Sequence, residues 1–296
     1  MTKWMLIFCT VFTSISMTDA LTANEFIQIK GSDTEVNLVQ VWAEIYMEKN
    51  SKAAISVTGG GSGVGITALI NGTADIANHS RPIKEKEYAA FEKKGIVATT
   101  VVIGIDALSI IVNEKNPIDS LSIEDLGRIY RSELDKWNQV GGSDKSISLY
   151  GRQPNSGTYV FFQEHVLGNK DYSPRMKQMN GNAQIVEAVK ADVGGIGYVG
   201  VGYLHDEKGN IHKGIKVVSI SMGDKPAYAP ANIEDVKSGH YPITRPLFQT
   251  IKGKPTGIVN DFIAYELNEE GQKIVIEQGF FPVGGAYLEL NKKAGF

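Results

Sequence analysis

The stretch Ile27-Gln28-Ile29-Lys30-Gly31-Ser32-Asp33-Thr34 decides the fold class of this 296-residue chain. Apolar and polar residues alternate from Ile27 to Lys30, which is the pattern of a half-buried strand. Apolar residues then recur at helical spacing from Val36 to Met47, so the strand is expected to turn directly into a helix. The turn carries hydroxyl side chains, and we expect them to cap that helix.

The same sequence of strand, glycine turn and helix occurs twice more. Residues 54–58 form a predicted strand before the turn Gly59 to Gly63, and a short helix follows. Residues 147–150 form another predicted strand, which leads through Arg152 to the turn Ser156-Gly157-Thr158. Strands that alternate with helices at this spacing predict an α/β fold, with ligands at the carboxyl ends of the strands.

Three helix N-termini at one edge of a sheet predict an anion site. Each carries unpaired N–H groups and roughly half a positive charge, and an arginine can grip two oxygens of a tetrahedral anion. Micromolar binding needs about 8 kcal/mol net, and association itself costs about 4 to 15 kcal/mol, so five to nine charge-assisted hydrogen bonds of roughly 1.5 to 3 kcal/mol are required. Neighbouring backbone N–H groups can supply them together with Ser32, Thr34, Ser62, Ser80, Arg152, Ser156 and Thr158.

The net charge of −3, without a basic stripe, argues against nucleic acid or an acidic membrane surface as partner. Residues 1–23 are predicted to be a secretory signal peptide, with Lys3 before an apolar run and cleavage after Ala20 or Ala23. Cys9 is the only cysteine and lies in this signal, so the mature chain is expected to have no disulfide. An exported protein without disulfides fits the bacterial periplasm.

Several motifs in order carry a resemblance to a known family. They are Gly31-Ser32-Asp33-Thr34, Gly59 to Gly63, Ser80-Arg81-Pro82, Trp137 to Gly142, Arg152 with Ser156-Gly157-Thr158, Ile196 to Gly200, and Tyr241 to Leu247. Together they resemble the phosphate-binding proteins of bacterial phosphate ABC transporters, which are periplasmic solute-binding proteins. The resemblance spans essentially the whole mature chain.

The resemblance implies a two-lobed type II periplasmic binding protein, each lobe a mixed sheet flanked by helices, that closes on one inorganic phosphate and delivers it to a membrane ABC permease. Residues 24–105 plus 246–296 would form one lobe, and residues 106–245 the other. The phosphate-contacting positions of the family fall here on Ser32, Thr34, Ser62, Ser80, Arg152, Ser156, Gly157 and Thr158. Gly63 and Arg81 are further candidates. The protein is expected to be a monomer without cofactor.

One departure from the family concerns the proton of hydrogen phosphate. Several members carry an aspartate, which accepts this proton, at or beside the corner where Ser80 stands here. Such an acceptor rejects sulfate, which has no proton to donate. Asp106 is our first candidate for the acceptor, before Asp33 and Asp75, and the alternative for Asp106 is a structural cap in the hinge. Arg81 either contacts the anion or braces its own corner.

Catalytic interpretations fit poorly. No lysine precedes Thr67 in the glycine-rich turn, and Val64 breaks a nucleophile elbow centred on Ser62. The histidines lack metal-ligand spacing, so we expect neither a metal site nor an enzyme. Three alternatives stay open: a receptor for a sulfate-like oxyanion, an exported phosphoester-handling enzyme that uses Ser62 or His79, and an adhesin or signalling receptor.

Overall fold

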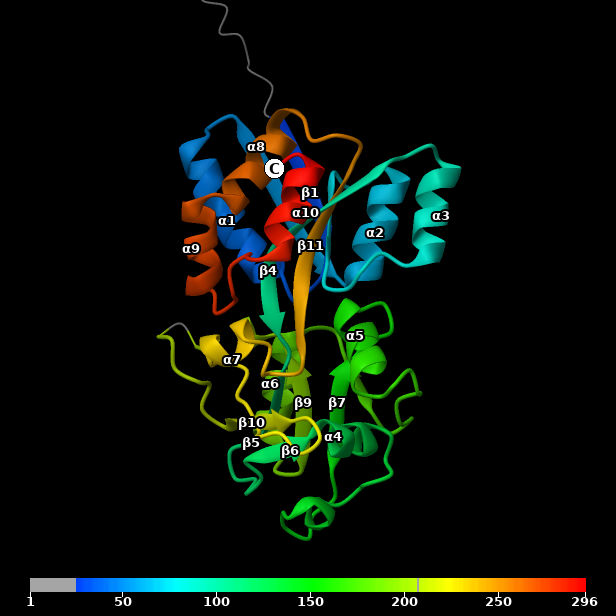
Figure 1. Cartoon of the computed structure of the whole chain (residues 1–296), viewed down its shortest axis with the longest axis vertical. Coiled ribbons are helices and arrows are strands. Elements are labelled where there is room, and N and C mark those ends of the chain that lie inside the picture. Colours follow the sequence, from blue (N-terminus) through cyan, green and yellow to red (C-terminus); the bar gives the residue numbers. More distant parts are fainter. Residues whose placement is uncertain (1–24, 207) are drawn as a thin grey trace, which may run out of the picture.

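Two α/β lobes lie end to end, joined by strands that run between them (Figure 1). The computed structural model describes residues 25–206 and 208–296. The predicted signal peptide, residues 1–23, lies outside the described residues. None of the helices within the described ranges is long and apolar enough to cross a membrane.

The first lobe contains a five-stranded mixed sheet in the order β2-β1-β3-β11-β4. Its strands are β1 (Glu25–Gly31), β2 (Ala53–Gly60), β3 (Ile76–His79), β4 (Ala98–Ala107) and β11 (Thr244–Lys252). β1 runs parallel to β2 and β3, whereas β11 is antiparallel to β3 and β4. The helices of this lobe are α1 (Val36–Lys49), α2 (Ser62–Asn71), α3 (Glu85–Lys93), α8 (Gly257–Leu267), α9 (Glu269–Glu277) and α10 (Ala286–Ala294).

The second lobe contains a six-stranded mixed sheet in the order β6-β10-β5-β9-β7-β8. Its strands are β5 (Ser109–Asn113), β6 (Ser120–Ser122), β7 (Ser148–Arg152), β8 (Lys177–Met179), β9 (Gly195–Val199) and β10 (Ile215–Ser221). Its helices are α4 (Ile123–Tyr130), α5 (Gly157–His165), α6 (Asn182–Ala191) and α7 (Ile233–Lys237), with 3-10 turns at Trp137–Val140 and Val201–Tyr203. The α/β fold with two mixed sheets, as predicted, is therefore confirmed.

Apolar side chains cover both faces of the first sheet. Ile27 and Ile29, the apolar positions of the alternating segment, are fully buried on the face that α1 covers with Trp42. The Trp42 indole N–H donates to the Gly271 carbonyl at 2.9 Å and so joins α1 to α9. Phe91 of α3 belongs to a separate cluster with α2 on the other face. Helices on both faces hold the strand ends, and the turns that follow them, in fixed positions.

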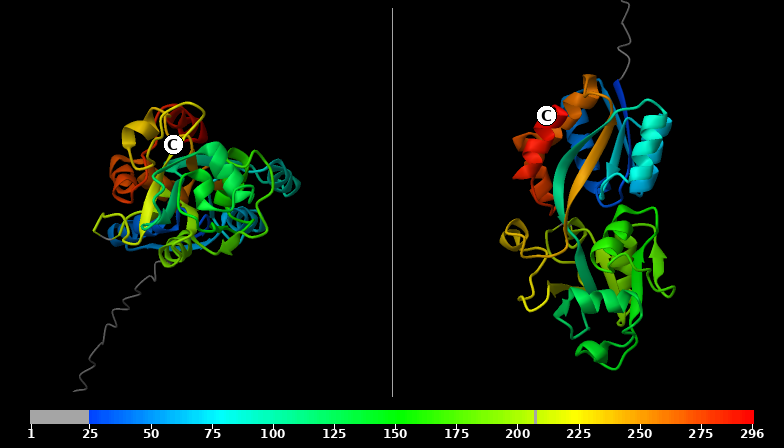
Figure 2. Two further views of the ribbon diagram at one scale, coloured as in Figure 1. Left: turned by 90° about the horizontal axis from the view of Figure 1, so that it is seen from below. Right: turned by 45° about the vertical axis from the view of Figure 1, so that its right-hand side comes forward.

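The connection between the lobes is made by β4 and β11, as Figure 2 shows in its right-hand view. Over residues 98–113 the structure has two strands, β4 and β5, separated at Leu108. The Leu108 N–H donates to the Ile243 carbonyl at 2.8 Å instead of continuing either ladder. This break lets the chain leave the first sheet and enter the second. Near the same end, Arg245 of β11 lies opposite Asp106 of β4.

An aromatic cluster fills the second lobe beneath β7. The rings of Phe162 and Tyr198 stack at 4.3 Å, and Tyr130 packs edge-on against Phe162 at 4.8 Å. The Tyr198 hydroxyl oxygen accepts the backbone N–H of Arg152 at 3.0 Å. The cluster thus fixes the end of β7, where a predicted binding residue lies.

One buried carboxyl of the first lobe predicts how stability depends on pH. Glu266 of α8 is fully buried and accepts a hydrogen bond from Gln249 Nε2 at 3.0 Å. Its other carboxyl oxygen has no hydrogen-bond partner in the part of the chain that the structure describes. Burial raises the pKa of Glu266 well above its ordinary value, and the nearby Glu35 carboxyl adds to the rise. The folded protein therefore holds this proton at pH values where the unfolded chain has released it.

We expect Glu266→Gln to stabilise the protein at neutral pH relative to the wild type. Above about pH 4.3 the unfolded wild type releases the Glu266 proton, so wild-type stability falls by about 1.4 kcal/mol per pH unit until the raised pKa of the folded state is reached. Glutamine does not ionise and avoids this loss. The free energy of unfolding of both proteins, measured with denaturant at pH 4 and pH 7, tests this prediction. The difference between variant and wild type should grow in favour of the variant from pH 4 to pH 7, and a difference independent of pH would contradict the prediction.

Candidate anion-binding site

The three predicted turns meet where the lobes face each other. The hydroxyl oxygens of Thr34 and Thr158, one from each lobe, lie 3.0 Å apart. Ser62 and Ser80, both of the first lobe, have their hydroxyl oxygens 3.5 Å apart. None of the six predicted hydroxyl residues is more than 2% exposed, namely Ser32, Thr34, Ser62, Ser80, Ser156 and Thr158. The structure thus gathers these residues into one buried hydroxyl cage.

Gly157 of α5 lies at a close approach of the two lobes within this cage. A Cβ atom built on Gly157 would collide with the hydroxyl oxygens of Ser62 and Ser80. Any side chain at this position would therefore displace these serine side chains or the lobes themselves. The approach also brings the N-terminus of α5 to the hydroxyls of the first lobe.

Helix capping by hydroxyls is confirmed at only one of the turns. The Ser156 oxygen accepts the N–H groups of Thr158 and Tyr159 at 3.2 and 3.4 Å and caps α5. At α1 and α2 the prediction is wrong, because Glu35 and Gly61 occupy the cap positions without a side-chain cap bond.

The hydroxyls that do not cap have other partners. Thr34 contacts Thr158 across the cleft, and the Ser62 oxygen accepts the backbone N–H of Ser80 at 3.1 Å. The Ser32 hydroxyl is buried with no hydrogen-bond partner among the described residues. These hydroxyls face the space between the lobes rather than their own helices.

Arg152 reaches the cage from β7 with unused hydrogen-bond donors. It is 2% exposed, and its Nη2 donates to the Asp33 carboxylate and to the Asn180 carbonyl, the latter at 3.1 Å. Its Nε and Nη1 are buried without a partner among the described residues. Leaving buried N–H groups of a charged side chain unpaired is costly, so these nitrogens indicate the position of an anion.

Arg245 is a second buried guanidinium in the cage, to which our sequence analysis assigned no role. Its Nη2 donates to the hydroxyl oxygens of Thr158 and Thr34 at 3.0 and 3.3 Å, and its Nη1 donates to the Ser80 carbonyl at 3.1 Å. The signal was present in the sequence, because Arg245 is the one charged residue of the extended segment Tyr241 to Leu247.

Asp106 lies in the cage but is already engaged. One oxygen accepts Nε and Nη2 of Arg245 at 3.0 and 2.8 Å, and the other accepts the Val201 N–H at 2.9 Å. These contacts are those of the structural cap that we considered as the alternative. The other two candidates differ, since Asp33 pairs with Arg152, whereas Asp75 accepts the Gln28 N–H at 2.8 Å just before β3, whose other end leads to Ser80.

Arg81 and Gly63 lie at the edge of the cage. The Arg81 guanidinium forms two hydrogen bonds with Glu87 at 2.7 and 2.8 Å and one with the Pro82 carbonyl at 2.8 Å. This is the bracing contact that we considered as an alternative to anion binding. The Gly63 N–H donates to the Asn155 carbonyl across the cleft at 3.0 Å.

His79 is placed as a structural residue. Its ring nitrogens lie 2.7 Å from the Arg81 carbonyl oxygen and 2.7 Å from the Thr250 hydroxyl oxygen, and its ring stacks on Phe248. Burial lowers the pKa of His79 to about 4, so the imidazole is neutral at physiological pH. With both nitrogens occupied, His79 is poorly placed to act as a general base.

Glu35 is a buried carboxyl beside the cage that the sequence pattern did not indicate. It directly follows Thr34, is fully buried, and neither oxygen has a hydrogen-bond partner among the described residues. Burial raises the pKa of Glu35 well above its ordinary value, an effect opposed by the Ser32 hydroxyl and the Arg245 charge. Burial therefore favours the neutral form of Glu35, which reduces its repulsion of an anion.

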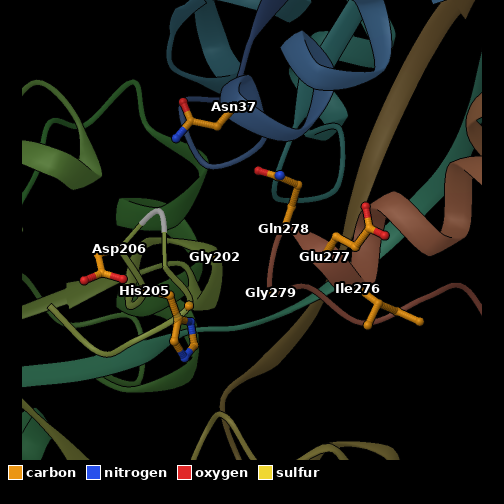
Figure 3. A pocket seen from close by; sticks show the side chains of 9 residues that line it. Asn37, Gly202, His205, Asp206, Ile276, Glu277, Gln278 and Gly279 are labelled. Carbon is orange, nitrogen blue, oxygen red and sulfur yellow. The ribbon is translucent and has the colours of Figure 1, made fainter. Parts of the chain in front are cut away.

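A separate pocket opens between the lobes, beside the start of α1 and the end of α9 (Figure 3). It is lined by Asn37, Gly202, His205, Asp206, Gly209, Ile276, Glu277, Gln278 and Gly279, and includes no predicted anion ligand. Within residues 25–206 and 208–296, no group of three or more His, Cys, Asp or Glu residues could hold a metal ion. The hydroxyl cage is thus the candidate site.

Comparisons with known proteins agree with this arrangement. The PBP superfamily domain matches residues 16–270. The phosphate-binding protein PstS of Pseudomonas aeruginosa is 30% identical over 276 residues, covering 88% of this chain and 83% of that protein. PstS of Bacillus subtilis is 31% identical over 266 residues, with 88% and 82% covered.

Solved structures of phosphate-transport proteins are also similar to this chain. A Clostridium perfringens protein assigned to a phosphate ABC transporter, solved with bound phosphate, has 25% identity and a TM-score of 0.76, covering 88% of this chain and all of that one. An ABC-type phosphate transport receptor from Vibrio cholerae has 27% identity and a TM-score of 0.68, covering 87% of this chain and 100% of its own. The resemblance seen in the sequence motifs is confirmed. This chain belongs to the PBP superfamily and, within it, to the family of PstS phosphate-binding proteins.

Proposed function

We propose that this protein binds inorganic phosphate between its lobes and delivers it to a membrane ABC permease. The observation that carries the proposal is the Arg152 guanidinium, which is buried in a cage of hydroxyls. Two of its nitrogens have no hydrogen-bond partner within residues 25–206 and 208–296. The relatives named phosphate-binding protein, and the Clostridium perfringens structure with bound phosphate, support this anion over sulfate.

The proposed ligands come from both lobes. They are Ser32, Thr34, Ser62 and Ser80 on one side, and Arg152, Ser156, Gly157 and Thr158 on the other, with Gly63 and Arg81 less central. Arg245 is added because it donates to two of these hydroxyls. Its charge is offset by Asp106, so Arg245 orients the cage more than it attracts the anion.

Several further features belong to this proposal. The lobes would comprise residues 24–105 plus 246–296 and residues 106–245, although β4 and β11 carry the first sheet two residues past these bounds, to Ala107 and from Thr244. The protein would act as a monomeric periplasmic receptor and not as an enzyme, after removal of the signal peptide. His79 is neutral and both of its ring nitrogens are engaged in hydrogen bonds, which supports a binding role over phosphoester chemistry.

The first test is calorimetric titration of residues 24–296, freed of bound anion, with phosphate and then sulfate. We expect tight phosphate binding, no sulfate binding, and at least about a 100-fold loss of phosphate affinity in Arg152→Ala, because two charge-assisted hydrogen bonds are removed. Arg128→Ala, which removes an exposed arginine of α4, is the matched control and should bind as the wild type does. Binding of both anions would indicate a general oxyanion receptor. Binding of neither anion would contradict the proposal and favour the enzyme or adhesin interpretation.

A second test concerns the proton acceptor, for which we propose Asp106. We expect Asp106→Asn to weaken phosphate binding and to admit sulfate, because the amide can donate to the oxygen that sulfate presents. Asp75→Asn, a change on the same sheet that leaves the cage intact, is the control. If Asp106→Asn lowered the affinity for both anions equally, or changed neither affinity, Asp106 would be a structural residue of the hinge and not the residue that sets anion selectivity.

A third test concerns closure of the lobes. We expect small-angle scattering to show a smaller radius of gyration when phosphate is saturating, because the anion joins ligands from both lobes. Gly157→Ala should abolish this compaction, since its Cβ would meet Ser62 and Ser80. The control Gly284→Ala places its Cβ in open space and should close normally. Compaction of Gly157→Ala equal to that of the wild type would contradict this model of closure.

A further inference from the structure

Asp33 belongs to the first lobe but is bound mainly by the second. It lies in the turn between β1 and α1, and its side chain is 16% exposed. Its Oδ1 accepts the Gly60 N–H at 2.7 Å, which is a contact within the first lobe. The carboxylate is therefore oriented by its own lobe and does not need the second lobe to hold its position.

Three side chains of the second lobe converge on Asp33. Arg152 donates its Nη2 to the Asp33 carboxylate. The Tyr203 hydroxyl donates to the Asp33 backbone carbonyl at 2.6 Å, and Asn182 Nδ2 donates to the same oxygen at 3.3 Å. Burial raises the pKa of the Tyr203 hydroxyl, which keeps it protonated as a donor.

The partners of Asp33 are themselves fixed within the second lobe. Asn182 begins α6, and its Oδ1 accepts the Gly200 N–H at 3.3 Å. Tyr203 lies on the 3-10 turn whose Val201 N–H contacts Asp106. Asp33 and its partners are thus each held in position by their own lobe. The contacts between them can form only when the lobes are close.

We propose that Asp33 is a positioning residue that fastens the closed lobes, holds Arg152 toward the bound anion, and thereby sets the rate at which phosphate is released. We call Asp33 with Arg152, Asn182 and Tyr203 the interlobe clasp. The inference rests on the proposed function.

The clasp affects phosphate release because Arg152 binds both Asp33 and, in the proposed function, the anion. One nitrogen of Arg152 is used by Asp33 and Asn180, and two are left unpaired. Closing without an anion would strip water from these two nitrogens and give nothing in exchange. Phosphate supplies the missing acceptors, so the clasp is stable only around a bound anion. Association begins from the open form, in which the clasp does not exist.

The cleanest variant is Tyr203→Phe, because it removes one hydrogen bond of the clasp and no charge. Asp33→Asn is less clean, since it also removes a negative charge close to the anion and so raises the attraction of Arg152. Tyr150→Phe is the matched control: it removes a hydroxyl that donates to Asp192 at 2.8 Å entirely within the second lobe. Both variants replace a largely buried tyrosine of the same lobe.

The experiment measures release of radiolabelled phosphate into excess unlabelled phosphate, and association by rapid mixing. We expect Tyr203→Phe to release phosphate about three- to tenfold faster, as the loss of one buried hydrogen bond implies, with an association rate within twofold of the wild type. Tyr150→Phe should leave both rates unchanged. Thermal unfolding without phosphate should be the same for Tyr203→Phe and the wild type, because the open form lacks the clasp.

The outcomes separate this inference from the proposed function. If the wild type binds phosphate but Tyr203→Phe releases it as slowly as Tyr150→Phe does, the clasp is wrong and the phosphate receptor stands. If Tyr203→Phe changes association as much as release, or melts lower without phosphate, its role is structural and the inference is again overturned. If the wild type binds no phosphate, the proposed function fails and the inference fails with it.

Discussion

The buried ion pair between Arg245 and Asp106 is the interaction on which the cage depends. The two residues lie opposite each other on β11 and β4, the strands that pass between the lobes, and both are almost completely buried. Removing two charges from water is expensive, and only close pairing with further hydrogen bonds makes it tolerable. Arg245 satisfies this need by donating to Thr34, Thr158 and the Ser80 carbonyl. The pair therefore ties the hydroxyls of both lobes to the hinge.

The charges of the cage follow from the same constraint. Each of the two arginines inside the cage has an aspartate beside it, Asp106 for Arg245 and Asp33 for Arg152. Burial favours the neutral form of the nearby Glu35 carboxyl and keeps the His79 imidazole neutral. A dianion would then enter a site with almost no net charge, where hydroxyls, helix N-termini and unpaired guanidinium nitrogens bind it. Directional hydrogen bonds, rather than attraction at long range, would decide which anion fits.

The aromatic cluster and the helices give this site its rigidity. Tyr198 holds the Arg152 backbone, and the helices on both faces of the first sheet fix the turns that carry Ser32 and Ser62. In the proposed closure, the lobes would move relative to each other about β4, β11 and the break at Leu108. Rigid lobes on a narrow connection suit a receptor that closes on a small ligand, because little internal order has to change.

The sequence by itself determined the elements and the family. The strand at Ile27 to Lys30, the helix α1 that follows it and the Ser156 cap all depend on neighbouring residues. Local sequence pattern records such preferences directly. Motif order was enough to indicate the PstS family. Local pattern failed where hydroxyls were assigned as caps of α1 and α2, because their contacts lie elsewhere in the chain.

Only the tertiary structure decided which charged residues form ion pairs in the cage. Arg245 meets Asp106 across 139 residues of sequence, and Asp33 meets Arg152 across 119. Strand register sets the first pair and the approach of the lobes sets the second. Burial likewise raises the pKa of Glu35, and burial with two hydrogen bonds makes His79 a structural residue. These properties depend on the electrostatic surroundings of a folded chain, which no stretch of neighbouring residues contains.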